Sequence, residues 1–204
     1  MLSAILLVIG YLLGSICSAV IVSYLFGLPD PRTEGSQNPG ATNILRLAGK
    51  KYALIVLLID ILKGLLPVLL AQVLNLSPMV AGFTCLAAVM GHMYPVFFHF
   101  QGGKGVATAI GGLLGLNFLL GVCVITIWLL VANFTRYSSL ASIVAILLSP
   151  LLGILMLGTL QVFMPLFIMA IFILYRHKDN ISRLVVGEEP KLKFKRNAFF
   201  RNSR

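Results

Sequence analysis

Long apolar runs separated by short polar segments dominate the chain. Five runs are clear, at residues 2–26, 52–74, 79–98, 140–156 and 160–175. A helix rises about 1.5 Å per residue and the hydrocarbon core of a bilayer is about 30 Å thick, so one crossing needs roughly 20 mostly apolar residues. Each run therefore predicts one membrane-spanning helix.

A further apolar stretch, residues 106–134, is long for one crossing and short for two. A single helix over it would be about 43 Å long. If the chain turns near residues 116–118, every Lys and Arg except Lys63 falls on one face of the membrane. Basic residues accumulate on the cytoplasmic side. We therefore predict an all-α polytopic membrane protein with seven transmembrane helices, its N-terminus outside and its C-terminus cytoplasmic, in which residues 106–116 form a short helix.

Composition agrees with a membrane protein and excludes several soluble classes. The chain is 59% hydrophobic and 11% charged, with a mean hydropathy of +0.99 and a formal net charge of +10. Soluble domains average about 25% charged residues, so an ordinary soluble globule, a disordered chain and a conventional basic nucleic-acid binder are excluded. No Lys or Arg precedes Arg32, so we expect the first run to be a retained span and not a signal peptide. We predict one transmembrane domain over residues 1–190 and a basic cytoplasmic tail over residues 191–204.

Three polar segments lie on the predicted cytoplasmic face. The first, residues 35–43 followed by Arg46, combines glycines with hydroxyl and amide side chains, which can direct N–H groups at an anion. The alternative is a polar turn that caps the next segment. The second, residues 102–105, places three glycines around Lys104 and resembles a phosphate cradle. It is not a Walker A loop, because Gly105 stands where that motif has Ser or Thr.

The third segment, residues 176–180, carries charged and amide side chains at the end of the last run, and Glu188 and Glu189 follow it. Charges at a helix end often mark only the membrane interface, but three such segments on one face favour a site for anions. Inside the membrane, Asp60 and Lys63 lie three residues apart on one helical face, where they can form a structural ion pair or contact a substrate. The histidines lack metal-ligand spacing, and no serine triad is evident.

Six motifs in a fixed order resemble those of one known family. They are residues 14–16, 35–43, 60–64, 91–97, 102–108 and 175–184. Together they resemble the bacterial acyl-phosphate:glycerol-3-phosphate acyltransferases, the PlsY family, from Gly14 to about Lys191. Two positions depart from the family pattern, because Gln37 stands where a glycine is usual and Cys17 where a proline is common.

The resemblance implies an O-acyltransferase in the first acylation step of phospholipid biosynthesis. It would transfer a fatty acyl group from acyl phosphate to the 1-hydroxyl of sn-glycerol 3-phosphate, giving 1-acylglycerol 3-phosphate (lysophosphatidic acid) and phosphate. We expect a multi-pass monomer in the bacterial inner membrane with its active site facing the cytoplasm. Its expected partners are the two small-molecule substrates and membrane lipid, with no cofactor, metal or nucleic acid. Because acyl phosphate is already activated, positioning and charge stabilisation can provide most of the catalysis.

The resemblance also implies which residues form the site. The expected catalytic residues are Lys104, His177 and Asn180. The expected substrate- and phosphate-binding residues are Ser36, Asn38, Gly40, Thr42, Asn43, Arg46, Gly102, Gly103, Gly105, Ser142 and Arg176. In this hypothesis the first loop holds one phosphate, the glycine turn with Lys104 holds the other, and His177 with Asn180 orients glycerol 3-phosphate. The proton acceptor is His177 or a substrate phosphate, and the resemblance favours the phosphate.

Two other classes of function suit the same pattern. A carrier for a phosphorylated metabolite would also combine seven spans with an anion site, but its binding groups would lie near the membrane midplane. Here they cluster in loops of one face. A membrane scaffold whose basic tail docks anionic lipid or an acidic protein is the other alternative.

Overall fold

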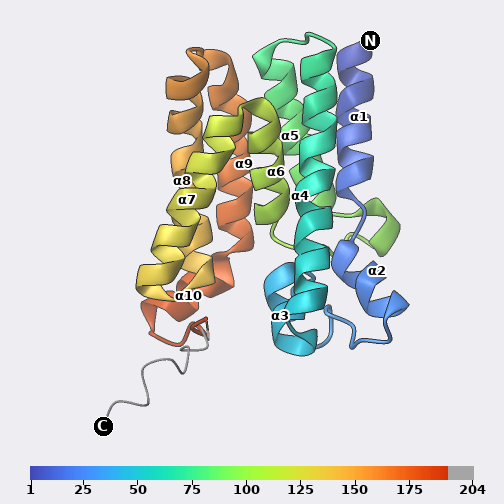
Figure 1. Ribbon diagram of the computed structural model, residues 1–204, viewed down its shortest axis with the longest axis vertical. Helices are drawn as coiled ribbons and strands as arrows, with labels where there is room; N and C mark the ends of the chain where they lie inside the picture. Colours follow the sequence, from blue (N-terminus) through green and yellow to red (C-terminus); the bar gives the residue numbers. More distant parts are fainter. Residues whose placement is uncertain (193–204) are drawn as a thin grey trace, which may run out of the picture.

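The computed structural model describes residues 1–192, which are helical with no strand. Figure 1 shows the arrangement of the helices. The elements are α1 (Leu2–Gly14), α2 (Ser18–Leu25), α3 (Ala41–Ala48), α4 (Lys50–Val73), α5 (Pro78–Met93), η1 (Val96–Phe98), α6 (Val106–Leu116), α7 (Phe118–Thr135), α8 (Ser138–Leu157), η2 (Leu160–Val162), α9 (Phe163–Arg176) and α10 (Lys178–Val185). The all-α prediction is therefore confirmed for the described part of the chain.

The long helices form a bundle whose members run side by side along its long axis (Figure 1). Five helical stretches are long and apolar enough to cross a membrane, or up to six if the bent pair α9–α10 counts as one span. Helix α6 is apolar but has only 11 residues. It ends at Leu116, and Asn117 separates it from α7, where its side chain accepts a hydrogen bond from the Leu120 N–H. The predicted turn at residues 116–118 is thus confirmed.

The first apolar run differs from the prediction, because it is not one continuous helix. The chain breaks after Gly14, and α2 turns away from the axis of α1 (Figure 1). At the break the Ile16 carbonyl accepts a hydrogen bond of 3.1 Å from the Ser18 N–H and one of 2.7 Å from Lys63 Nζ. The buried Lys63 side chain of α4 therefore provides a hydrogen bond that the backbone of a continuous helix would have provided itself.

A second difference is helix α3, which lies within a segment that was expected to be a polar loop or turn. Its polar residues Thr42, Asn43 and Arg46 stand at helical spacing, and Ile44 is fully buried against α2 and α4. The short amphipathic pattern is hard to recognise from sequence because it spans barely two turns. This helix is important for the site, because it brings the first polar segment over the end of the bundle.

Glycines allow close contact at two points between α4 and α6. A Cβ atom at Gly64 of α4 would lie 2.0 Å from the Thr108 carbonyl oxygen of α6, and one at Gly111 would lie 1.9 Å from the Ile61 carbonyl oxygen. Small residues permit such approach between helices in lipid, where packing replaces the hydrophobic drive. The α4–α6 contact fixes α6 and the glycine turn that precedes it.

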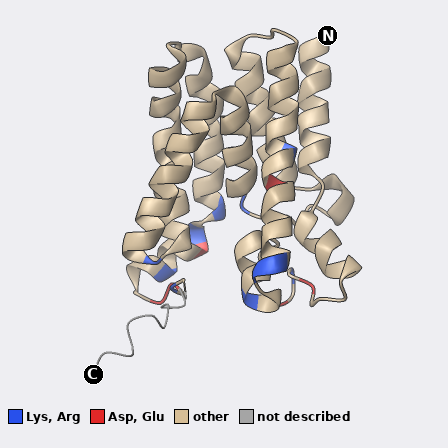
Figure 2. Ribbon diagram, in the orientation of Figure 1, with Lys and Arg blue, Asp and Glu red and all other residues tan. Residues whose placement is uncertain are grey.

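Charged residues gather at the end of the bundle that carries α2, α3 and α10 (Figure 2). Within the described residues, the opposite end, where the N-terminus lies, has no Lys, Arg, Asp or Glu. Asp60 and Lys63 lie deeper in the bundle and form the predicted ion pair at 2.8 Å. Of the predicted basic tail, residues 193–204 lie outside the described part of the chain.

Candidate active site

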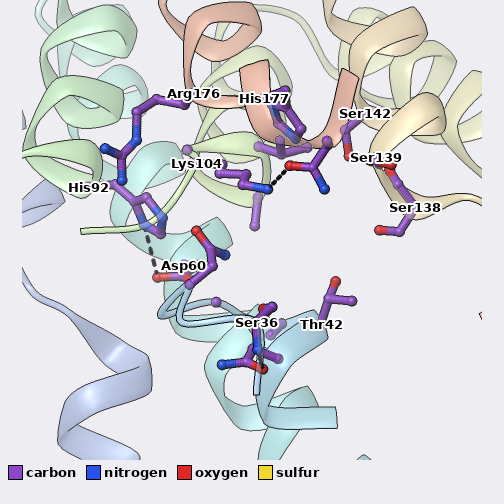
Figure 3. A pocket seen from close by; sticks show the side chains of 18 of the residues that line it. Ser36, Thr42, Asp60, His92, Lys104, Ser138, Ser139, Ser142, Arg176 and His177 are labelled. Atoms are coloured by element: carbon purple, nitrogen blue, oxygen red, sulfur yellow. Dashed lines mark hydrogen bonds and ion pairs between the residues drawn. The ribbon is translucent and has the colours of Figure 1, made fainter. Parts of the chain in front are cut away.

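One cavity of about 1070 Å³ lies at the charged end of the bundle. Every site residue predicted from the sequence lines it except Gly102 and Gly103, which are the buried residues of the turn that carries Lys104. Figure 3 shows Ser36 and Thr42 on one side of the space and Lys104 on the other. Segments far apart in the sequence therefore meet around one volume.

Hydrogen bonds to its backbone atoms hold the glycine turn, residues 102–105, in place. The Gly103 N–H donates to the His92 carbonyl at 3.1 Å. Arg176 donates from Nε to the Gly103 carbonyl at 3.2 Å and from Nη2 to the Gly102 carbonyl at 2.7 Å. The guanidinium also lies 5.6 Å from the centre of the Tyr94 ring. Two guanidinium hydrogen bonds of Arg176 are therefore made to the turn itself.

Lys104 is the cation at the centre of the cavity. Its Nζ donates to Asn180 Oδ1, and Asn180 Nδ2 in turn donates to Glu189 Oε1 at 2.6 Å. Arg183 Nε donates to the second oxygen of Glu189 at 2.8 Å. This chain fixes the Asn180 amide with its oxygen toward the lysine. Burial lowers the pKa of Lys104 to about 8, with the Glu189 carboxylate opposing the shift.

His177 follows the end of α9, and its ring is oriented by the helix. The Nδ1 atom lies 2.7 Å from the Ile173 carbonyl oxygen. A carbonyl can only accept, so Nδ1 carries a proton in this contact, and the neutral ring has its lone pair on Nε2. His177 is 3% exposed and lines the cavity. The ring can therefore accept a hydrogen bond from a bound hydroxyl group or, once protonated, donate one.

The segment before α3 is organised by Asn43. Its Oδ1 accepts from the Ser36 N–H at 2.9 Å, and its Nδ2 donates to the carbonyls of Pro31 and Glu34, both at 3.0 Å. Because these bonds occupy the amide, Asn43 shapes the loop in this structure. Gln37 has φ 55°, a left-handed conformation that favours glycine, which agrees with the glycine that is usual at this position in the PlsY family.

Two serines near the start of α8 differ in their hydrogen bonding. Ser142 Oγ donates to the Ser138 carbonyl at 2.8 Å and accepts from Trp128 Nε1 at 3.0 Å. Ser139 also lines the cavity, and its hydroxyl lies near the Glu189 carboxylate and helps to lower the pKa of that group. The sequence analysis did not select Ser139.

The cavity continues from this polar region to apolar side chains of three membrane helices. They are Leu57 and Ile61 of α4, Ile110 of α6, and Ile125, Trp128 and Leu129 of α7. Leu57 and Leu129 are also 37% and 55% exposed, so this apolar wall reaches the outer surface of the bundle. The anionic and hydrocarbon parts of one amphiphile can therefore occupy the same cavity.

The family model described as glycerol-3-phosphate acyltransferase matches residues 4–187. The chain belongs to this family. A glycerol-3-phosphate acyltransferase of Legionella pneumophila (strain Corby) is 60% identical over 190 residues, which are 93% of this chain and 69% of the relative. One from Francisella tularensis subsp. holarctica (strain OSU18) is 50% identical over 187 residues, which are 92% and 91% of the two chains.

Solved structures of PlsY, an integral membrane glycerol 3-phosphate acyltransferase, have the same fold. The glycerol 3-phosphate form is 40% identical with a TM-score of 0.88, and the alignment covers 95% of this chain and 96% of that one. The lysophosphatidic acid form is 39% identical with a TM-score of 0.86 and the same coverage. This protein is thus an integral membrane acyltransferase, as its motifs predicted.

Other residues of this acyltransferase's cavity were not selected from the sequence, namely Asp60, His92, Ser138, Ser139, Asp179, Arg183 and Glu189. Glu189 has a recognisable signal, because a carboxylate that follows a basic helix end is a natural partner for its cations. His92 lies in the motif at residues 91–97, but a single histidine in an apolar run is usually a packing residue, and its chemistry alone did not indicate a role. Within residues 1–192, no group of three or more His, Cys, Asp or Glu could hold a metal ion.

Proposed function

We propose that the protein transfers an acyl group from acyl phosphate to the 1-hydroxyl of glycerol 3-phosphate. The products are 1-acylglycerol 3-phosphate and inorganic phosphate. The observation that carries the proposal is the two-part cavity, in which Lys104 and the polar loops adjoin an apolar wall from α4, α6 and α7. The polar part suits two phosphates, and the apolar part suits the chain of an acyl donor.

In the proposed reaction the 1-hydroxyl oxygen attacks the acyl carbonyl carbon. The bond from that carbon to the phosphate oxygen breaks, and phosphate leaves with the bonding electrons. Lys104 stabilises the negative charge that develops on the carbonyl oxygen and the leaving phosphate. Ser36, Thr42 and Arg46 hold the second phosphate, and Asn180 orients the lysine.

The hydroxyl proton has two possible acceptors in this scheme. The leaving phosphate is one, and His177 Nε2 is the other, because Nδ1 is already bonded to the Ile173 carbonyl. We propose the phosphate as acceptor and His177 as the group that orients the hydroxyl. No covalent acyl-enzyme is required, because the donor is already activated.

We also propose seven membrane crossings, with the N-terminus outside and the active site facing the cytoplasm of a bacterial inner membrane. The gathering of Lys and Arg at one end of the bundle supports this orientation. In this proposal α6 is a short crossing, residues 1–190 are one domain, and residues 191–204 are a cytoplasmic tail. We propose a monomer, because one chain supplies all walls of the cavity.

The test uses purified protein in detergent with palmitoyl phosphate, with and without glycerol 3-phosphate. We expect phosphate release that depends on glycerol 3-phosphate and is matched by 1-acylglycerol 3-phosphate, without acyl-CoA or added metal. Lys104→Ala should lower the rate about 100-fold or more, whereas Lys51→Ala, which removes an exposed cation outside the cavity, should leave it unchanged.

Two other outcomes would overturn the proposal. Acylation from acyl-CoA but not from acyl phosphate would assign a different donor. No turnover by folded protein, together with uptake of a phosphorylated solute into proteoliposomes, would identify a carrier. The position of the cavity at one end of the bundle favours the enzyme, because carriers bind their cargo near the midplane.

A further inference from the structure

A cluster of buried polar residues lies beside the site, where the helices α2, α4 and α5 meet. Asp60 of α4 is 2% exposed and Lys63 is 4% exposed. Asp60 Oδ1 accepts from Ser18 Oγ of α2 at 2.8 Å and lies 2.8 Å from Lys63 Nζ. Lys63 Nζ also donates to the Ile16 carbonyl at 2.7 Å. The two charges thus compensate each other, as buried charges must.

His92 of α5 connects this cluster to the glycine turn. Its Nδ1 lies 3.5 Å from Asp60 Oδ1, which is a close electrostatic contact and longer than an ordinary hydrogen bond. Figure 3 shows the ring between Asp60 and the residues around Lys104. The ring is 7% exposed, and both His92 and Asp60 line the cavity.

The other side of His92 is in contact with Gly103. Its carbonyl accepts the Gly103 N–H at 3.1 Å. A Cβ atom at Gly103 would lie 2.2 Å from His92 Nε2, so the ring directly abuts the backbone of the turn. Lys104 is the next residue along the chain. A rotation of the imidazole therefore displaces the backbone from which the catalytic cation extends.

We infer that His92 is a positioning residue for acyl transfer. Asp60, itself held by Lys63 and Ser18, fixes the orientation of the ring, and the ring with the His92 carbonyl fixes Gly103 and the reach of Lys104. His92 acts through Lys104 and does not touch the reacting atoms. This inference rests on the proposed role of Lys104, and it gives the intramembrane ion pair a function beyond joining α4 to the α1–α2 break.

Two substitutions test the inference. His92→Leu replaces the ring with an apolar side chain and removes the contact with Asp60. We expect the KM for a phosphorylated substrate to rise and kcat/KM per folded enzyme to fall about 10- to 100-fold, as for misplacement of a catalytic group. His92→Asn retains an N–H in the position of Nδ1 and should restore most of the loss. Thr84→Val, which removes a fully buried hydroxyl elsewhere on α5, is the matched control and should leave KM unchanged.

A purely structural role predicts a different kinetic result. Poor folding lowers the amount of active enzyme and so lowers the apparent kcat, while KM stays the same. The inference is overturned if His92→Leu changes only the apparent kcat in proportion to the folded fraction, measured by gel filtration and thermal unfolding in detergent.

A double substitution tests whether His92 acts through Lys104. Binding of glycerol 3-phosphate and of a nonreactive acyl phosphonate is measured by calorimetry for His92→Leu, Lys104→Ala and the double variant. We expect the double variant to bind no more weakly than Lys104→Ala, because residues that act through one group are not additive. Additive losses would overturn the inference. These binding measurements need no turnover, so they remain decisive if acyl phosphate is not the donor.

Discussion

At the scale of single residues, the charge of Lys104 depends on its surroundings. Burial disfavours its charge, while the amide oxygen of Asn180 and the nearby Glu189 carboxylate favour it. The result is a lysine whose pKa is lowered to about 8 and which is therefore charged at neutral pH but titrates just above it. Such a group interacts strongly with phosphate, and its charge is sensitive to a rise in pH just above neutrality.

The first prediction follows from this pKa. A lysine is cationic below its pKa, so kcat/KM should fall as the pH rises through about 8, where free enzyme loses the Lys104 proton. Lys104→Arg keeps its charge to far higher pH. Its residual activity should lack this alkaline limb, and kcat/KM measured against pH with both substrates below saturation is the measurement. An unchanged limb in Lys104→Arg would assign the titration to another group.

The second prediction concerns Glu189, whose two oxygens hold Asn180 and Arg183. Glu189→Gln removes the charge and one acceptor, which should weaken the hold on Asn180 by about 1–3 kcal/mol. We expect lower kcat/KM and a lower melting temperature in detergent. Glu188→Gln alters the exposed neighbour and is the matched control, with no expected change. Equal effects of the two substitutions would contradict the role of the contact.

Residue types predicted which segments meet around the cavity but not the partner of each side chain. Nearly all predicted residues line one cavity. Asn43, Ser142 and Arg176, however, use their hydrogen bonds on the loop, on α8 and on the glycine turn. A sequence shows that a donor is present, but its partner depends on distant segments that only the fold brings together.

At the scale of helices, the break between α1 and α2 is the main difference from the predicted continuous helix. The sequence does not indicate this break, because the apolar run from Leu2 to Leu25 contains no helix-breaking residue except its glycines. In the PlsY family a proline is common at the position of Cys17, which would have signalled the break. The physical cause is tertiary, because Lys63 satisfies the Ile16 carbonyl from another helix.

The third prediction uses this break. Cys17 has φ −82°, close to the value that proline imposes. Cys17→Pro should therefore be tolerated and should raise the stability by about 0.4–1 kcal/mol. Ser15→Pro is the contrasting variant, because the Ser15 N–H donates to the Tyr11 carbonyl at 2.9 Å and would be lost. Thermal unfolding in detergent distinguishes them, and destabilisation by Cys17→Pro would contradict the geometry.

At the scale of the whole molecule, hydropathy and charge predicted the all-α membrane class of the fold and the end of the bundle at which the cavity lies. They also predicted a short helix over residues 106–116, and α6 has these bounds. They could not predict that α3 lies at the entrance or that α6 packs so closely against α4. Both features depend on packing, α3 through buried Ile44 and α6 through Gly64 and Gly111. How closely two helices approach depends on both of them, so the sequence of one helix does not predict it.

The fourth prediction tests the proposed orientation. The native cysteines are first replaced, and a single cysteine is introduced at Asn75 or at Gln37, which lie in loops at opposite ends of the bundle. In intact cells lacking an outer-membrane barrier, a membrane-impermeant maleimide should label Asn75→Cys and should reach Gln37→Cys only after permeabilisation. The reverse pattern would invert the proposed topology.

The apolar wall that reaches the surface beside Leu57 and Leu129 has a kinetic consequence. On the proposed reaction, a donor with its chain in the bilayer meets this wall sideways and never leaves the hydrocarbon. Its supply is then counted as molecules per area of membrane, while glycerol 3-phosphate is counted per volume of water. Diluting the donor with inert lipid should slow the enzyme even when the total amount of donor in the tube is constant.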